Sequence, residues 1–284
     1  MLLRTPWDHT IDLKDTFKSK KGRIIPLSPQ EQEEVTMFLD NQLKTAYIRP
    51  FKSSQTSLVF FVLKKYGKKC MVQDYQYLNE STVKNNYPLP LIGQLVDKLQ
   101  GSKLFMKMDL KWGYNNVRIK EGDEWKAIFV CFQEGFKPLV MYFRLCDFPT
   151  TFQAMMNEIF ADMDDVVVVY IDDLMIFIKT DNQAEHDGIV LEVLHCLEEN
   201  DLCVKPKKCM FCATEVDFLG MIFGCDGISM DQTKVKAILN WPQSKNIKGV
   251  RSFLGLANFY WRFIRDYVCI ACPLHDLTKT EEPF

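Results

Sequence analysis

The chain has 284 residues, of which 47% are hydrophobic and 25% are charged. At roughly 150 residues per domain, this length predicts two domains or one elaborate domain, and the apolar fraction excludes a disordered chain. The formal net charge of −2, from 35 basic and 37 acidic side chains, excludes a uniformly basic protein that wraps nucleic acid. A local basic patch remains open.

We expect no targeting segment at the beginning of this sequence. Residues 1–10 contain one basic residue and no apolar run of signal-peptide length, so we expect an intracellular protein, in the cytoplasm or nucleus, that is not secreted. Residues 29–46 predict a helix that Ser28 caps, with Val35 and Leu39 on one face. Further predicted elements are strands at 57–63 and 70–72, a helix at 91–100 and a strand at 104–110.

The rest of the chain predicts a helix, a strand pair, a long helix and a mostly helical end. Pro149 opens the first of these, because proline is favoured in a first helical turn. The predicted ranges are a helix at 150–161, a strand pair at 166–178, a helix at 183–200, a hairpin at 214–230 and helices around Pro242 at 231–277. This order indicates an α+β fold with an antiparallel sheet and helices on one face.

The strongest apolar run, 166–178, contains Asp172 and Asp173 in its middle. The run is short for a membrane span, and two carboxylates inside a bilayer would cost several kcal/mol, so we expect no membrane association. A buried hairpin accommodates the pair better, because its turn lifts the acids to the end of the sheet.

A further acid, Asp109, ends another apolar strand. If the two strands are neighbours in one sheet, Asp109 and Asp172 come within a few ångströms of each other, and clustered carboxylates require divalent cations. Hard oxygen ligands favour Mg²⁺ or Mn²⁺, and two such ions ~3.5–4 Å apart activate a hydroxyl and steady a leaving phosphate. Taken alone, an Asp-Asp pair in such a run is also typical of an ordinary turn.

Ten cysteines include two pairs with C-x-x-C spacing, Cys209/Cys212 and Cys269/Cys272. A zinc site built from them would require these distant pairs to converge. Reduced thiols that act as small core residues are the favoured interpretation.

Several stretches around the acids occur in the order typical of one family. From about Pro6 to Lys279, the chain resembles the reverse transcriptase of gypsy-type LTR retrotransposons, as a fragment of a fungal-type Pol polyprotein. The stretches that carry the resemblance are AYIRPF at 46–51, DYQYLNESTVKNNYPLP at 74–90, FMKMDLKWGYNNVRIKEGDEWKA at 105–127, PTTFQAMMNE at 149–158, YIDD at 170–173, KPKKCMFCATEVDFLG at 205–220 and SFLGLANFYWRFIR at 252–265.

The resemblance implies a right-hand polymerase of fingers, palm and thumb. These subdomains would be mainly residues 1–100, 101–230 and 231–284, and no ribonuclease H, protease or integrase segment is expected. The implied cofactor is a pair of Mg²⁺ ions, with Mn²⁺ as the alternative. Their implied ligands are Asp109, Leu110, Asp172 and Asp173, of which Asp173 is the weaker or supporting one.

The resemblance also implies residues that bind substrates. Tyr114 would lie beneath the sugar of the incoming nucleotide and exclude a 2′-hydroxyl, with a packed core tyrosine as the alternative. Lys207 and Lys208 match two palm lysines, one of which protonates the pyrophosphate leaving group; we assign this catalytic role to Lys208, with a solvated basic turn as the alternative. The other implied contacts are Lys64, Lys65 and Phe143 with the nucleotide, Phe218, Leu219, Gly220 and Met221 with the primer end, and Arg251, Gly255 and Phe259 with the duplex.

Four positions depart from the family pattern. Cys70 and Gln76 stand where the family has arginine, and a thiol cannot replace the bidentate grip of a guanidinium on phosphate. Arg144 stands in place of glycine, where it would block the nucleotide pocket or distort a backbone that needs positive φ. Asp147 replaces asparagine. These departures predict impaired activity.

Three functions therefore compete. The first is an RNA-directed DNA polymerase domain, a nucleotidyltransferase that extends a primer on an RNA or DNA template with dNTPs, within a larger polyprotein or as a homodimer. The second is a catalytically impaired remnant of a mobile element that keeps the fold and binds nucleic acid. The third, an RNA-dependent RNA polymerase, is disfavoured by Tyr114 and by Tyr170 and Ile171 before the acid pair, where those polymerases tend to have glycine.

Opposite charges are segregated along the sequence. Residues 162–201 contain twelve acids and one base, whereas residues 205–265 contain ten bases and four acids. A near-neutral sum is therefore compatible with a basic surface for phosphates in the second block.

Overall fold

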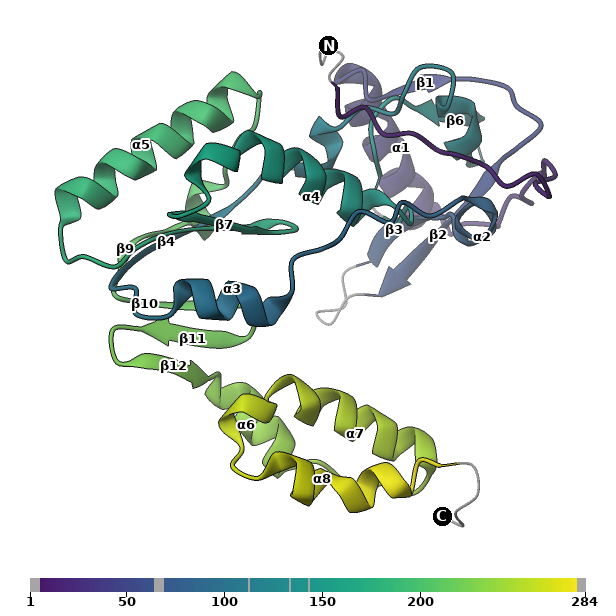
Figure 1. Ribbon diagram of the computed structural model, residues 1–284. Coiled ribbons are helices and arrows are strands. Elements are labelled where there is room, and N and C mark those ends of the chain that lie inside the picture. Colours follow the sequence, from purple (N-terminus) through teal and green to yellow (C-terminus); the bar gives the residue numbers. More distant parts are fainter. Residues whose placement is uncertain (1–5, 64–68, 112, 133, 143, 280–284) are drawn as a thin grey trace. The chain divides into compact units, whose positions relative to one another are not determined.

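The computed structural model describes residues 6–63, 69–111, 113–132, 134–142 and 144–279 (Figure 1). The chain forms two compact units, each made of segments that are far apart in the sequence. The first unit consists of Met1–Pro90, Met108–Met175 and Ile189–Cys209, and the second of Leu91–Lys107, Ile176–Gly188 and Met210–Phe284. These units follow a different division of the chain from the predicted fingers, palm and thumb, whose ranges stay predictions.

The first unit contains a mixed five-stranded sheet. Its strands are β1 (Ile48–Pro50), β2 (Ser57–Leu63), β3 (Lys69–Asp74), β5 (Phe129–Val130) and β6 (Gly135–Pro138), in the order β1-β6-β5-β2-β3. Strands β2 and β3 pair antiparallel, with Leu58 opposite Asp74, which confirms the strands predicted there. Strand β2 runs parallel to β5, with Ser57 opposite Phe129. The order of elements had predicted an antiparallel sheet, and this parallel pair departs from that prediction.

Helix α1 (Pro29–Lys44) lies beside β1 (Figure 1) and confirms the helix predicted at 29–46. Its start is a capping box, in which Ser28 Oγ accepts the Glu31 N–H and the Glu31 carboxylate accepts the Ser28 N–H. Val35 and Leu39 are buried on one face. A short helix, α2 (Gln76–Ser81), follows β3.

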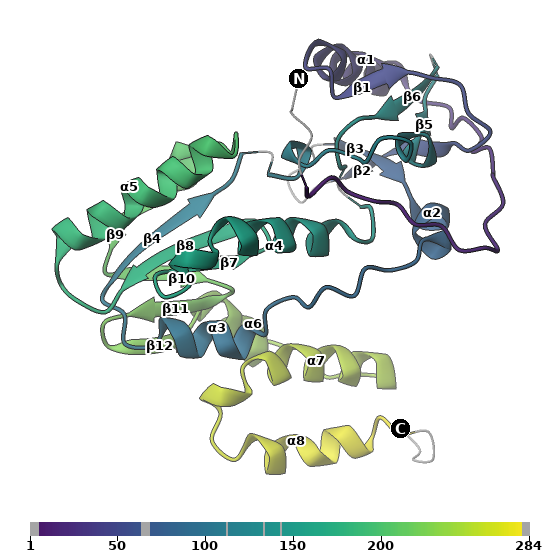
Figure 2. The same cartoon turned by 45° about the horizontal axis from the view of Figure 1, so that its top comes forward.

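The apolar run with the acid pair folds as the predicted hairpin. Its strands are β7 (Val167–Tyr170) and β8 (Asp173–Ile178), joined by a turn at Ile171 and Asp172. Helix α4 (Phe148–Ile159) runs along β7 (Figure 2) and buries Phe152 and Met156. Valines and aliphatic side chains of both strands are almost fully buried. The core of the hairpin is therefore apolar, and the two acids lie at the end of the hairpin where the turn is.

A four-stranded sheet has the order β7-β8-β4-β9. Strand β4 (Leu104–Asp109) pairs antiparallel with β9 (Met210–Ala213), with Phe105 opposite Ala213 and Lys107 opposite Met210. Strands β8 and β4 are neighbours in this order, which confirms the prediction that the strand ending in Asp109 and the hairpin carrying Asp172 lie side by side in one sheet.

Helix α5 (Gln183–Glu199) confirms the helix predicted at 183–200. Among the residues that the structure describes, no helix combines the length and apolar character needed to cross a membrane.

The second unit contains a three-stranded meander and several helices. Strands β10 (Glu215–Phe218), β11 (Met221–Gly224) and β12 (Gly227–Met230) form two successive hairpins, where the sequence had suggested one. The helices are α3 (Ile92–Leu99), α6 (Gln232–Leu239), α7 (Ile247–Phe259) and α8 (Tyr267–Asp276). Val250, Leu254 and Ala271 form a small core between α7 and α8.

A buried histidine near the N-terminus makes stability depend on pH. His9 is 3% exposed, and its Nδ1 lies 3.0 Å from Thr151 Oγ1 on α4. Burial lowers the pKa of His9 from 6.5 to about 4, although Asp147, Asp123 and Asp12 oppose this shift. The folded chain therefore holds His9 neutral at pH values where the unfolded chain protonates it.

We expect the free energy of unfolding to fall as the pH drops from 6.5 towards 4, because only the unfolded chain takes up the proton in this window. The loss attributable to His9 is on the order of 3 kcal/mol. Urea denaturation at several pH values should show a shallower pH dependence for His9→Asn than for the natural chain. The control His195→Asn, at an exposed site, should keep the natural slope, and equal slopes for all three chains would contradict the assignment.

Candidate active site

Asp109 lies at the end of β4 and is held by two lysines. Its Oδ1 accepts a hydrogen bond from Lys205 Nζ at 2.5 Å, and its Oδ2 accepts one from Lys208 Nζ at 3.0 Å. Lys205 Nζ also donates to the Leu110 carbonyl at 3.0 Å, and its backbone N–H donates to the Asp109 carbonyl at 2.8 Å. Both oxygens of this carboxylate are therefore engaged by ammonium groups.

Electrostatics link all three predicted aspartates to Lys208. Burial opposes ionisation of Asp109, but hydrogen bonds from Lys205 and Lys208 prevail and lower its pKa. The hydrogen bond to Asp109 raises the pKa of Lys208, and the charges of Asp173 and Asp172 add to this shift. Lys208 therefore contacts Asp109 directly and lies within the field of Asp172 and Asp173, and all four residues belong to the first unit.

The turn that carries Asp172 is strained and braced. Ile171 has φ 55°, a left-handed conformation that is costly for a β-branched residue. Gln153, fully buried on α4, accepts the Ile171 N–H at 2.8 Å through Oε1 and donates to the Val169 carbonyl at 3.0 Å through Nε2. The side-chain amide thus supplies partners for backbone groups on both sides of Tyr170 and holds the turn in place.

The oxygen donors suit a hard divalent cation. Carboxylates and a main-chain carbonyl are the ligands that Mg²⁺ prefers. Among the described residues, the three metal-ligating side chains whose donor atoms all lie within 4.8 Å of one another belong to the second unit and do not include the three aspartates. Asp109, Asp172 and Asp173 are therefore more widely spread, with the lysine ammonium groups on both oxygens of Asp109.

A second strained segment follows the acid site in the sequence. Arg144 has φ 92°, which confirms that its position requires the positive φ for which glycine is suited. Asn79 clamps this segment, since its Nδ2 donates to the Arg144 carbonyl at 2.7 Å and its Oδ1 accepts the Cys146 N–H at 2.9 Å. The Arg144 guanidinium lies 6.0 Å from the centre of the Phe60 ring on β2. The arginine therefore covers a strand of the mixed sheet.

The predicted nucleotide contacts fall largely outside the described residues. Lys64, Lys65 and Phe143 lie there, as do the side chains of Tyr114 and Cys70. The backbone of Tyr114 belongs to a short 3-10 helix, Gly113–Asn116. The nucleotide-binding assignments stay predictions.

The predicted primer contacts form a tight hairpin turn in the second unit. Leu219 and Gly220 both have positive φ, 52° and 73°, as in the two-residue turns that match the twist of paired strands. Tyr260 donates its hydroxyl hydrogen bond to the Gly220 carbonyl at 3.1 Å. Phe218 and Met221, on either side of the turn, are buried. The turn itself is half-buried, and its contact with a primer stays a prediction.

The predicted duplex contacts lie on or at the end of α7. A Cβ added at Gly255 would meet no atom of the described residues within 4 Å, so this face of the helix is open to them. Arg251 Nη2 donates to the Thr278 carbonyl at 3.0 Å, and the Phe259 ring lies 4.9 Å from the Tyr260 ring. Binding of nucleic acid by these residues stays a prediction.

Sequence reasoning missed two residues of the site. Lys205 was overlooked in favour of Lys207 and Lys208, although all three belong to the basic run 205–208. Gln153 had no signal beyond its place in the PTTFQ stretch, because a polar residue among apolar helix positions does not reveal its partner. Of the two lysines named from the sequence, Lys208 is the one whose ammonium donates a hydrogen bond to Asp109.

Comparison with known proteins agrees with the motif order. A family model described as reverse transcriptase (RNA-dependent DNA polymerase) matches residues 62–223. The chain is 36% identical over 260 residues to the Transposon Tf2-3 and Tf2-4 polyproteins of Schizosaccharomyces pombe, an alignment that covers 91% of this chain. The chain spans 19% of the length of these relatives.

Solved structures share the fold at low sequence identity. A foamy viral protease-reverse transcriptase in complex with an RNA/DNA hybrid superposes with a TM-score of 0.81 at 22% identity, over 97% of this chain and 37% of that chain. A form of the same viral protein in complex with double-stranded DNA gives 0.84 at 23% identity, over 94% and 47% of the two chains. The predicted α+β right-hand fold is thereby confirmed.

We expect Gln153→Leu to destabilise the chain, because it leaves the Ile171 N–H and the Val169 carbonyl without their partner. Each unsatisfied buried group costs about 1–3 kcal/mol, so the free energy of unfolding should fall by about 2–4 kcal/mol. Chemical denaturation measures this change, and hydrogen exchange should show faster exchange at the Ile171 amide.

The matched control is Glu158→Gln, near the exposed end of the same helix, which keeps an oxygen to accept the Trp7 indole N–H and should leave both measurements unchanged. An unchanged stability together with a still protected Ile171 amide in Gln153→Leu would contradict the role given to Gln153.

Proposed function

The chain belongs to the reverse transcriptase (RNA-dependent DNA polymerase) family, and from this membership we propose that it extends a primer 3′-hydroxyl with deoxynucleotides on an RNA or DNA template. The observation that carries the proposal is that β4 and β8 are neighbours in one sheet, with Asp109 at the end of β4, Asp173 at the start of β8 and Asp172 in the turn before it. All three lie within the residues that match the family. We place the chain in the gypsy-type branch, as one segment of a larger polyprotein, because its curated relatives are polyproteins.

Each residue of the acid site has a proposed role. Asp109 and Asp172 are the main ligands of a pair of Mg²⁺ ions or, alternatively, Mn²⁺, with Asp173 and the Leu110 carbonyl in support. Such ions, when bound, supply activation of the attacking hydroxyl and neutralisation of phosphate charge. Lys205 and Lys208 neutralise the charge of Asp109 until this carboxylate binds a metal ion.

Lys208 is the proposed proton donor. The primer 3′-hydroxyl gives its proton to solvent and its oxygen forms a bond to the α-phosphorus of the nucleotide, the bond from that phosphorus to the bridging oxygen breaks, and the pyrophosphate that leaves gains a proton from Lys208. An ammonium with a raised pKa stays protonated at neutral pH. Lys208 also donates a hydrogen bond to Asp109, the carboxylate proposed to bind the metal ions at the reacting phosphate. Lys208 is therefore the proposed general acid.

Further parts of the chain are proposed to bind the substrates. The foamy viral structures with the same fold are complexes with an RNA/DNA hybrid and with double-stranded DNA, so we propose a template–primer duplex as partner of this chain. The half-buried turn at Leu219 and Gly220, the open face at Gly255 and the basic stretch 205–265 are its proposed contacts. Lys64, Lys65, Tyr114 and Phe143 are proposed for the dNTP, and a homodimer is the alternative to a polyprotein segment.

Arg144 favours a second candidate, a polymerase fold with impaired turnover. Arg144 has a strained φ of 92° and a guanidinium 6.0 Å from the centre of the Phe60 ring, and both support the expectation that a bulky cation here, instead of the family's glycine, hinders turnover. Cys70 and Gln76 add to this expectation, because neither can grip a phosphate as an arginine does.

A primer-extension assay with Mg²⁺ tests the proposal. We expect incorporation of dNTPs but not rNTPs, and a loss on the order of 10² or more in Asp172→Asn, since a metal ligand at the reacting phosphate is removed. The matched control Glu192→Gln changes an exposed carboxylate of α5 and should keep full activity. Incorporation of rNTPs would favour the RNA polymerase, and duplex binding without any incorporation would favour the impaired remnant.

We expect Arg144→Gly to raise the free energy of unfolding by about 1 kcal/mol, because glycine adopts positive φ without a steric penalty. Arg144→Ala is the matched control, since it removes the guanidinium but keeps a Cβ at the strained position. Thermal or urea denaturation compares the two variants, and equal stabilities would contradict the strain argument. If Arg144 impairs turnover, Arg144→Gly combined with Cys70→Arg should increase primer extension.

A further inference from the structure

His186, in the first turn of α5, is buried without hydrogen-bond partners. Its side chain is 1% exposed, and neither ring nitrogen has a partner among the described residues. The nearest carboxylate oxygen, Asp187 Oδ1, lies 3.8 Å from Nδ1, which is too far for a hydrogen bond. A buried imidazole with two unsatisfied nitrogens costs free energy unless another species binds it.

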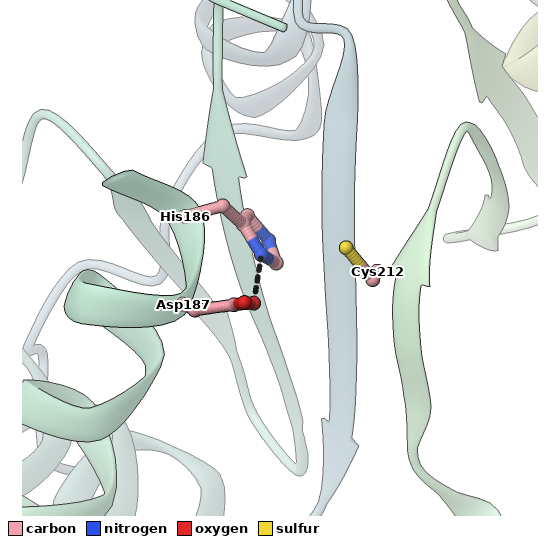
Figure 3. A group of neighbouring side chains, drawn as sticks. All are labelled: His186, Asp187 and Cys212. Atoms are coloured by element: carbon pink, nitrogen blue, oxygen red, sulfur yellow. Dashed lines mark ion pairs between the residues drawn. The ribbon is translucent and has the colours of Figure 1, made fainter. Parts of the chain in front are cut away.

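Two further metal-ligating groups face this imidazole. The Cys212 sulfur points towards it from β9, and Asp187 lies beside it on the helix (Figure 3). One ligand atom from each of the three residues lies within 4.8 Å of the other two. All three residues belong to the second unit, and none takes part in the acid site of the first unit.

We propose that His186, Asp187 and Cys212 form a binding site for a single Zn²⁺ ion, completed by a water molecule. Imidazole nitrogen, thiolate sulfur and carboxylate oxygen are the three ligand types that zinc accepts. The Asp187 side chain is 59% exposed, so the fourth position opens to solvent. This assignment is independent of the proposed polymerase function.

The spacing requires only a small contraction. Tetrahedral zinc with ligands about 2.0–2.3 Å away holds its donors about 3.3–3.6 Å apart. The Nδ1 to Oδ1 separation of 3.8 Å is close to this value, and the 4.8 Å bound on the others falls within reach of a side-chain rotation. Cys212, on β9, has φ 47°, a left-handed backbone conformation that is unfavourable for a residue other than glycine.

The donor set also discriminates between metals. Mg²⁺ prefers oxygen ligands, so a site with sulfur and nitrogen disfavours it and favours zinc over the ion proposed for the three aspartates. Burial lowers the pKa of His186, against the effect of Asp187, so the imidazole is neutral and able to bind a metal at physiological pH. Bound zinc would tie the first turn of α5 to strand β9, across a long separation in the sequence.

The test measures zinc binding to the full chain in excess Mg²⁺, which keeps the three aspartates from contributing. Competition with a chromophoric chelator should give one zinc per chain, and Co²⁺ in its place should give a thiolate-to-metal charge-transfer band. Cys212→Ser should lose this band, and both Cys212→Ser and Asp187→Asn should weaken zinc binding at least about tenfold, since even outer partners of a metal contribute about 10–100-fold.

The matched control is Cys225→Ser, which removes an exposed thiol from the β11–β12 turn and should keep the zinc and the cobalt band. Circular dichroism of the metal-free variants separates loss of the site from loss of the fold. Zinc should raise the melting temperature of the natural chain and of Cys225→Ser but not that of Cys212→Ser. Zinc binding that is unchanged in both Cys212→Ser and Asp187→Asn, or a cobalt complex without thiolate character, would overturn the proposal.

Discussion

The buried amide of Gln153 is the contact on which the geometry of the acid site depends. A hairpin with a dry core can present Asp172 at its end only if the turn is sharp, and Ile171 adopts a costly positive φ to make it so. The two hydrogen bonds from Gln153 hold this turn against α4. The helix therefore positions Asp172 through the backbone of the turn, in which Ile171 carries the positive φ.

Charge compensation is the second constraint. Three carboxylates near one another repel, and the structure meets this repulsion with the lysines of a single basic segment. Lys205 and Lys208 engage both oxygens of Asp109, so a cation that binds this carboxylate competes with ammonium groups already in place. The same lysines thus stabilise the free protein and set the affinity of Asp109 for an incoming ion, which couples folding to the proposed chemistry.

The two units offer metal ligands of different hardness. Carboxylate and carbonyl oxygens in the first unit suit magnesium, whereas the imidazole, thiolate and carboxylate of the second suit zinc. The C-x-x-C spacing of Cys209 and Cys212 had pointed to zinc only through a convergence with the distant Cys269 and Cys272. Cys212 instead meets a histidine and an aspartate of α5, partners that no spacing of cysteines predicts.

The sequence by itself determined the element types, the acids at the ends of apolar runs and the family, because periodicity, capping and motif order are written in neighbouring residues. It also located the positive φ at Arg144, since the family has glycine there. Only the tertiary structure decided which groups meet. Lys205 reaches Asp109 across 96 residues, and Gln153 reaches Ile171 across 18. The parallel pairing of β2 with β5 and the approach of Cys212 to His186 likewise follow from packing. Such contacts depend on how strands and helices are arranged in space, and local sequence patterns carry no information about that arrangement.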